Sequence, residues 1–325
     1  MSGRLAIAID LGGTQLRAAV VDERGAVLAR ANTKTQSSAN PSEIVNQICE
    51  VAVSVASGFD KTSISAAGIC SPGPLDSLTG TIIAVPTMPS WRDVPVRSIL
   101  SDRLGLPVVL ENDAIAATNG EWLFGAGRGL RNLVYVTVST GIGGGAVVDG
   151  RLLRGRRGMA GHVGHMIIVQ DGPLCSCGAQ GCFEALASGT ALAARGQQVV
   201  QETPSSLLAA EPSDGITARS IAEAARKGDP LALDLMGRQA RILGIGFASL
   251  VHLFSPDVVV MGGGVSLAFD LLERHLTETV RETVMAPFRT VRVVPAALGD
   301  NAGIAGVAAL ALDSTREPTR LMAGK

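Results

Sequence analysis

The chain has 325 residues, of which 46 % are hydrophobic, 18 % charged and only 3 % aromatic. Its 28 basic and 29 acidic residues leave a net charge of −1, which gives no electrostatic footprint for nucleic acid or for an anionic membrane. The length predicts two domains, each with its own core. The 39 glycines and the many aliphatic residues favour an α/β fold with covered sheets and tight turns.

The first half of the chain alternates apolar strands with helices. We expect strands over 4–10, 15–22, 26–30 and 63–69, with a helix over 41–57. The turn-rich stretch 71–91 is long, which predicts a substrate loop. A short helix near 95–104, a strand over 107–110 and a helix to about residue 124 complete this half.

The second half begins with the same pattern of a strand followed by a glycine turn. We expect a strand over 132–138, a glycine turn over 139–145, helices near 188–196 and 218–227, an exposed loop over 197–215, a helix over 230–254 and a strand over 257–261. Asp229 and Pro230 predict the start of the long helix, as N-cap and first-turn proline. The pattern indicates a loose duplication of one unit, without the short period of a solenoid.

No targeting signal or membrane span is expected. The first strand starts within a few residues of the N-terminus, without a cleavable apolar segment before it. The longest apolar stretch, residues 242–251, is too short to cross a bilayer. Because Cys49 and Cys70 stand alone in the sequence, the cysteine pattern fits a reducing compartment, and we expect a cytoplasmic protein.

Three glycine turns follow apolar strands, at residues 10–14, 139–145 and 261–264. Glycine lets backbone N–H groups approach phosphate oxygens closely, and neighbouring hydroxyls add donors. Neither the P-loop nor the Rossmann spacing is present, so we expect ATP to be held in another manner. The candidate residues for binding this cofactor are Asp10, Gly12, Gly13, Thr14, Thr140, Gly141, Gly143, Gly262, Gly263 and Gly264.

Two aspartates follow strands, and each has two interpretations. Asp10 could orient the hydration shell of Mg²⁺ around the phosphates, or it could cap a turn. Asp113 could be the general base that deprotonates an attacking hydroxyl during phosphoryl transfer. It could equally be part of a helix N-cap, because Asn112 and Asp113 precede a helix. The residues alone leave both choices open.

A dense cluster of potential metal ligands lies between residues 165 and 184. Cys175, Cys177 and Cys182 fall within eight residues, and His165 precedes them by ten. Three thiolates and an imidazole at these separations can close a tetrahedron around Zn²⁺. Four protein ligands leave no position for water, so this zinc would be structural. The alternative is a group of reduced, buried cysteines.

These motifs together resemble the ROK family of sugar kinases and sugar-responsive repressors. The resemblance rests on residues 10–14 with Arg17, on 111–114, 140–145 and 161–165, and on the cysteine motif that ends at Glu184. It implies an α/β, two-lobed actin-like ATPase-domain (ribonuclease H-like) fold with an interdomain cleft and a structural zinc loop. The implied lobes are 1–120, joined by a C-terminal helix over 301–325, and 121–300 with the zinc loop 165–184.

The same resemblance assigns roles to individual residues. Asp113 is implied as the catalytic base, and His165, Cys175, Cys177 and Cys182 as the zinc ligands. The sugar would be held by Gly73, Asn112, Asp113, His162, His165 and Glu184. Repressors of the family carry an additional N-terminal helix-turn-helix domain. Because the first glycine turn here begins at Asp10, we expect a kinase.

The expected function is an ATP- and Mg²⁺-dependent kinase that phosphorylates the 6-hydroxyl of a hexose or N-acylhexosamine. N-acetylmannosamine and glucose are the leading candidates. His162 stands where glucose kinases of the family usually have glutamate, and it resembles N-acetylmannosamine kinases. Thr87 stands where related kinases often have asparagine. The alternative is a non-catalytic sugar-binding regulator. The resemblance also implies a homodimer, with a small sugar as the partner molecule.

Overall fold

The computed structural model describes residues 3–85 and 87–316. Contacts divide the chain into two compact units. The first unit contains the chain up to Gly125, a short return segment over Arg154–Ala160, and the chain from Asp300 onward. The second unit contains Ala126–Leu153 and Gly161–Gly299. Pro86 and the part of the expected C-terminal helix beyond residue 316 lie outside the described residues.

The first unit is built on a five-stranded sheet in the order β3-β2-β1-β4-β8. Its strands are β1 Leu5–Leu11, β2 Gln15–Asp22, β3 Val27–Lys34, β4 Ile64–Ser71 and β8 Val108–Asn112. Strand β1 is antiparallel to β2 and parallel to β4, and β4 is parallel to β8. The strand positions agree closely with those expected from the sequence.

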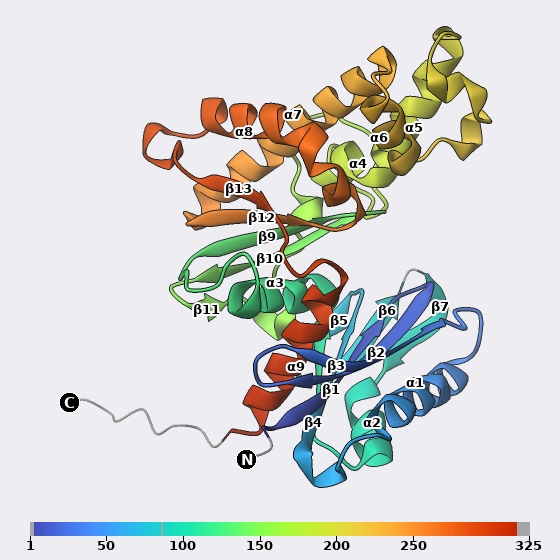
Figure 1. Ribbon diagram of the computed structural model, residues 1–325, viewed down its shortest axis with the longest axis vertical. Helices are drawn as coiled ribbons and strands as arrows, with labels where there is room; N and C mark the ends of the chain where they lie inside the picture. Colours follow the sequence, from blue (N-terminus) through green and yellow to red (C-terminus); the bar gives the residue numbers. More distant parts are fainter. Residues whose placement is uncertain (1–2, 86, 317–325) are drawn as a thin grey trace. The chain divides into compact units, whose positions relative to one another are not determined.

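Helices cover both faces of this sheet (Figure 1). They are α1 Pro41–Ala56 and α2 Val96–Leu104 on one face, and α3 Asp113–Phe124 and α9 Ala302–Ser314 on the other. Strand β1 has buried residues on both faces, because successive side chains of a strand point to opposite sides of the sheet. Ile7 and Ile9 join the core with α1 and α2, whereas Ala6 and Ala8 pack against α9.

The second unit repeats the topology of the first. Its sheet has the order β11-β10-β9-β12-β13, with β9 antiparallel to β10 and parallel to β12. The strands are β9 Leu133–Val138, β10 Ile142–Val148, β11 Arg151–Leu152, β12 Val258–Gly262 and β13 Arg292–Pro295. The duplication expected from two strand–glycine-turn patterns is therefore confirmed.

Helices α4 Phe183–Ala187, α5 Gly189–Val199, α6 Ala218–Arg226, α7 Pro230–Phe254 and α8 Phe269–Thr283 belong to the second unit. The long helix α7 begins where expected, with the Asp229 carboxylate accepting from the backbone N–H of Ala232 and with proline in its first turn. Phe247 on α7 is fully buried and meets Phe183 of α4 edge to face.

The expectation of a loop over 71–91 is wrong. The stretch forms a three-stranded sheet of β5 Leu75–Asp76, β6 Thr81–Val85 and β7 Met88–Val94. Ile82, Met88 and Trp91 are completely buried in the core of the first unit. Proline, glycine and serine between short apolar groups masked the strands, because their stability comes from packing on that core.

Two further expectations need correction. The glycine turn after β9 ends at Gly141, and Gly143 to Gly145 pair with β9 as part of β10. A Cβ on Gly144 would lie 2.5 Å from the carbonyl oxygen of Tyr135, so this glycine serves close strand packing. The expected loop 197–215 contains the end of α5 and three short 3₁₀ turns. No described helix combines the length and apolarity needed to cross a membrane.

Helices α3 and α9 pack closely because glycine lies at their contact. A Cβ on Gly120 would lie 2.2 Å from the carbonyl oxygen of Ala302, and one on Gly306 only 1.7 Å from that of Ala116. The Asn119 side chain donates a hydrogen bond to the Gly306 carbonyl at 3.0 Å. These contacts anchor α3, whose first residue is Asp113.

Candidate active site and metal-ligand cluster

The carboxyl ends of three parallel strands bring the candidate catalytic residues of the first unit together. In the register of the sheet, Asp10 on β1 lies beside Cys70 on β4, and Cys70 lies beside Glu111 on β8. Asp113 follows β8 directly, as the first residue of α3. Ligand sites of open α/β sheets lie at this end of the strands.

Asp113 occupies an environment that suits a general base. Burial raises the pKa of its carboxyl to about 6, and the nearby negative charge of Asp10 adds to the rise. Its Oδ1 accepts from the backbone N–H of Ala114 at 2.8 Å. The capping role belongs to Asn112, whose side chain accepts from the N–H groups of Ala114 and Ile115. Asn112 is thus the N-cap residue, and Asp113 adds a hydrogen bond from the same Ala114 N–H.

Asp10 is held by two neighbours. Its Oδ2 lies 3.3 Å from the Arg17 guanidinium, and the Cys70 thiol donates to its Oδ1 at 3.8 Å. Burial raises the pKa of Asp10, and the positive charge of Arg17 offsets part of that rise. Cys70 is fully buried, and desolvation together with the two carboxylates raises its thiol pKa well above the ordinary value. This thiol therefore stays protonated and acts as a donor.

The first glycine turn connects β1 to β2 through Gly12, Gly13 and Thr14. The Gly12 N–H donates to the Gln15 carbonyl at 2.9 Å. A Cβ on Gly13 would lie 2.2 Å from the Thr87 hydroxyl, so this position requires glycine. Thr87, the residue that departs from the family pattern, thus packs directly on the turn.

The return segment 154–160 forms ion pairs with two buried carboxylates of the first unit. These ion pairs were not expected from the sequence. Arg154 Nε lies 3.0 Å from Glu111 Oε2, and Arg157 Nε lies 2.7 Å from Asp76 Oδ2. The Arg157 hydrogen bond lowers the pKa of Asp76. Arg157 itself has a left-handed backbone with φ of 62°, which is strained for a residue other than glycine. Gly73 lies between β4 and β5 of the same unit.

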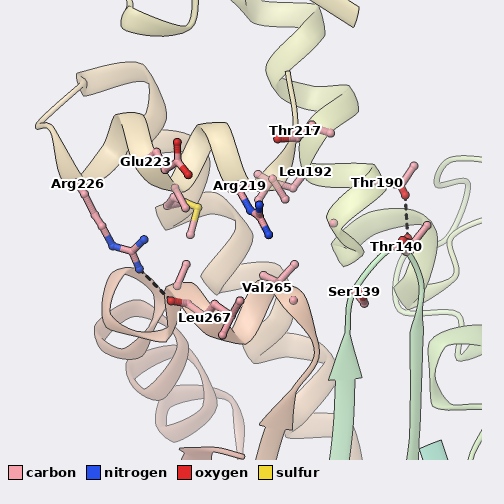
Figure 2. Close-up of a pocket in the computed structure, with 17 residues that line it drawn as sticks. Ser139, Thr140, Thr190, Leu192, Thr217, Arg219, Glu223, Arg226, Val265 and Leu267 are labelled. Atoms are coloured by element: carbon pink, nitrogen blue, oxygen red, sulfur yellow. Dashed lines mark hydrogen bonds between the residues drawn. The ribbon is translucent and has the colours of Figure 1, made fainter. Parts of the chain in front are cut away.

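In the second unit a cavity of about 630 Å³ lies beside the second glycine turn (Figure 2). Such a volume suits a ligand the size of a nucleoside. Thr140 and Gly264 were expected there from the sequence and do line it. Ser139 of the expected glycine turn lines it too, and the polar lining residues that the sequence did not indicate are Thr190, Thr217, Arg219, Glu223 and Arg226. Arg226 is paired with Asp270 at 2.8 Å, whereas Arg219 extends into the space (Figure 2).

Two of the other glycines expected around the phosphates lie where neighbouring atoms leave no room for a side chain. A Cβ on Gly262 would lie 2.2 Å from the Tyr135 hydroxyl. One on Gly263, whose φ is 82°, would lie 2.5 Å from the Val138 carbonyl. Gly264 follows and reaches the cavity. Gly141 ends the turn and Gly143 lies inside β10.

The four expected metal ligands are brought together. One donor atom from each of His165, Cys175, Cys177 and Cys182 lies within 4.8 Å of all the others. Cys177 Sγ and Cys182 Sγ are 3.6 Å apart, and Cys175 Sγ lies 3.7 Å from His165 Nδ1. A tetrahedron with Zn–S bonds of about 2.3 Å has edges of about 3.8 Å, so the donors fit zinc.

The chemistry of the thiols supports the same conclusion. Burial and the neighbouring thiols raise the pKa of Cys182 to about 12. The Cys182 thiol would therefore become a thiolate ligand only where a cation stabilises its negative charge. Because Nδ1 of His165 faces the cluster, its Nε2 is left for another partner.

Two further residues expected to bind sugar lie near this cluster. The rings of His162 and His165 stack with centroids 6.2 Å apart. Burial, with a smaller effect of His165, lowers the pKa of His162. Glu184 Oε2 accepts from the backbone N–H of Ile142 at 2.8 Å. Asn112 and Asp113 belong to the first unit, and His162, His165 and Glu184 to the second.

Known proteins resemble this chain over nearly its whole length. The glucokinase of Thermotoga maritima is 38 % identical over 94 % of this chain and 96 % of its own length. That of Streptomyces coelicolor is 39 % identical over 98 % of this chain and 99 % of its own. A crystal structure of a ROK family glucokinase from Streptomyces griseus, in complex with glucose and AMPPNP, has a TM-score of 0.83 at 39 % identity. It covers 95 % of this chain and 99 % of that one.

These similarities extend over nearly the whole chain, and the actin-like ATPase-domain fold implied by the family resemblance is confirmed. The family model described as "ROK family" matches residues 6–314. The chain belongs to the ROK family.

Proposed function

We propose that this sugar kinase transfers the γ-phosphoryl group of ATP to the 6-hydroxyl of a hexose, and that glucose is its preferred acceptor. The choice of glucose is supported by the glucokinases of Thermotoga maritima and Streptomyces coelicolor, which are 38 % and 39 % identical to it. The observation that carries the catalytic assignment is Asp113, a carboxylate with a raised pKa at the carboxyl ends of parallel strands.

Asp113 acts as the general base in this proposal. Its pKa of about 6 leaves it ionised at neutral pH yet more basic than an ordinary aspartate. As the 6-hydroxyl oxygen attacks the γ-phosphorus, its proton passes to Asp113. The bond from the γ-phosphorus to the bridging oxygen breaks, and ADP leaves. Catalysis then rests on positioning and charge stabilisation, as is usual for phosphoryl transfer.

The remaining site residues position the nucleotide and the sugar. The cavity beside Ser139 and Thr140 would hold the nucleoside, with Gly264 at its wall. Mg²⁺ would supply charge neutralisation at the phosphates, with Asp10 oriented toward its hydration shell. Gly12, Gly13 and Thr14 would contribute backbone and hydroxyl donors. Asn112, His162, His165, Glu184 and Gly73 would contact the sugar.

A structural zinc would be held by His165, Cys175, Cys177 and Cys182, whose mutual distances fit this ion. It would keep the loop between His165 and Glu184 in one conformation before the sugar arrives. His162 lies three residues from the first ligand and is the residue most relevant to the choice between glucose and N-acetylmannosamine. Imidazole can donate or accept where a carboxylate only accepts.

A coupled assay of ADP release tests the proposal with glucose, N-acetylmannosamine, N-acetylglucosamine, mannose and fructose as acceptors. The proposal expects glucose to give the highest kcat/KM. Preference for N-acetylmannosamine would overturn the sugar assignment and identify His162 as the residue to exchange. If no sugar causes ADP release although sugars raise the melting temperature, the chain is a sugar-binding regulator.

We also propose that the protein is a cytoplasmic homodimer. The cysteine pattern supports the location, and the family resemblance supports the assembly. Sedimentation or light scattering would measure the mass in solution, and a monomeric mass would contradict the dimer. Cell fractionation would test the location.

A further inference from the structure

The carboxylate of Glu184 contacts the second glycine turn as well as the loop of metal ligands. Its family role, if the proposed function holds, is to bind the sugar. We propose that Glu184 is also a positioning residue for the nucleotide, because it holds the turn Ser139–Gly141 in the conformation that lines the cavity. The proposal rests on the proposed function and extends it to a residue that does not itself line the cavity.

The first contact is direct. Glu184 Oε2 accepts from the backbone N–H of Ile142, the first residue of β10, at 2.8 Å. A Cβ on Gly141 would lie 2.5 Å from the same oxygen. The carboxylate therefore fits directly against the end of the turn.

Residues just after Glu184 hold the same turn from the same side. The N–H of Gly189 donates to the Ser139 carbonyl at 2.7 Å, and the Thr190 hydroxyl donates to the Thr140 carbonyl at 2.8 Å. A Cβ on Gly189 would lie 2.8 Å from the Ser139 carbonyl. Consecutive helices α4 and α5 thus fix the backbone of the turn, and Ser139 and Thr140 remain on the cavity wall (Figure 2).

The other carboxylate oxygen faces the loop of metal ligands. The Ser176 hydroxyl donates to Glu184 Oε1 at 3.4 Å. Cys182 lies two residues before Glu184, and the intervening Phe183 is completely buried, with its N–H donating to the Met166 carbonyl at 2.8 Å. The position of Glu184 is therefore set by the loop that carries the four metal ligands. Glu184 therefore connects the loop of metal ligands to the turn that lines the cavity.

Two conservative substitutions separate this role from sugar binding. Glu184→Gln keeps the length of the side chain and an oxygen acceptor, so the Ile142 contact survives. Glu184→Asp keeps the charge but withdraws the carboxylate by one methylene, so the contact is lost. Calorimetry with AMPPNP in the absence of sugar measures the nucleotide affinity of each. We expect Glu184→Asp to weaken AMPPNP binding about tenfold and Glu184→Gln to stay close to the wild type.

Hydrogen exchange at the Ile142 amide gives a second readout. We expect protection in the wild type and in Glu184→Gln, and fast exchange in Glu184→Asp. Bound metal should be equal in all three proteins, because none of the ligands is changed. This readout also serves if one variant is too unstable for calorimetry.

The outcomes are distinct. If Glu184→Asp binds AMPPNP like the wild type and loses only sugar affinity, Glu184 acts on the sugar alone and the inference is wrong. Equal weakening by Asp and Gln would also overturn it, because Gln keeps the contact with the Ile142 N–H and should then preserve nucleotide binding. A wild type that does not bind AMPPNP at all overturns the proposed function as well. Those results cannot be confused with one another.

Discussion

Replacing Asp113 with asparagine should stabilise the first unit at neutral pH. Burial raises the pKa of this carboxyl from an ordinary 3.8 to about 6. Between these values the folded protein binds a proton that the unfolded chain has released. The stability of the wild type therefore falls as pH rises from about 4 to about 7, and asparagine removes this loss. The two pKa values correspond to an upper value of about 3 kcal/mol in the free energy of unfolding.

Tryptophan fluorescence during urea unfolding measures this effect in the correct part of the molecule. The two tryptophans, Trp91 and Trp122, both belong to the first unit, as does Asp113. The gain from Asp113→Asn should approach its full size at pH 8 and nearly vanish at about pH 3, where most of the aspartate is protonated in both states. The exposed Asp102→Asn is the matched control and should show no such pH dependence.

A variant that is equally stable or less stable at pH 8 would refute the reasoning. The carboxylate would then be well solvated or paired, and burial would not be the cause of a raised pKa. A gain that persists unchanged at about pH 3 would also refute it, because neutral aspartate and asparagine carry the same charge. The expected trade of stability for a basic carboxylate is typical of active sites.

Three further outcomes are expected. The kcat of Asp113→Asn should fall about 10²- to 10⁴-fold, with sugar binding retained. The kcat/KM of the wild type should fall as the pH drops through about 6, because the base must be ionised. A fall in kcat/KM that begins only near pH 4 would contradict this. Cys182→Ser should lose bound metal and melt at a lower temperature, whereas the isolated Cys49→Ser should keep its metal. Metal content and differential scanning fluorimetry decide. Gly306→Ala would place a Cβ 1.7 Å from a backbone carbonyl oxygen of α3. Urea unfolding should therefore show a free energy of unfolding lower by about 1–3 kcal/mol. The control Gly58→Ala should lose almost none, because nothing lies within 4 Å of its Cβ. Equal stability of those two variants would mean that α3 and α9 are free to separate.

Our proposal that Asp113 is the general base uses both its residue type and its surroundings in the structure. From residue types alone, a helix N-cap and a general base were equally plausible. In the structure Asn112 is the N-cap residue of α3, and burial raises the pKa of Asp113, which supports our proposal that Asp113 is the general base. Capping is a local property, whereas desolvation depends on everything packed around the side chain.

Local features of the chain were readable from the sequence. The duplicated strand–glycine-turn pattern, the start of α7 at Asp229 and Pro230, and the four potential metal ligands all follow from short-range spacing. Caps act over one helical turn, and ligands close in sequence can meet with little loss of loop entropy. For this reason the expected strands, helices and cysteine cluster agree with the structure.

Contacts between distant segments required the tertiary structure. The sheet over 75–94 forms because Trp91 and Met88 are buried on a core built from other elements. Arg154 and Arg157 return to the first unit from a distant part of the chain. Arg219 and Glu223 of α6 line the cavity beside the second glycine turn, although no glycine motif indicates them. Burial and ion pairing between distant segments depend on how the whole chain folds, so the spacing of residues along the sequence does not predict them.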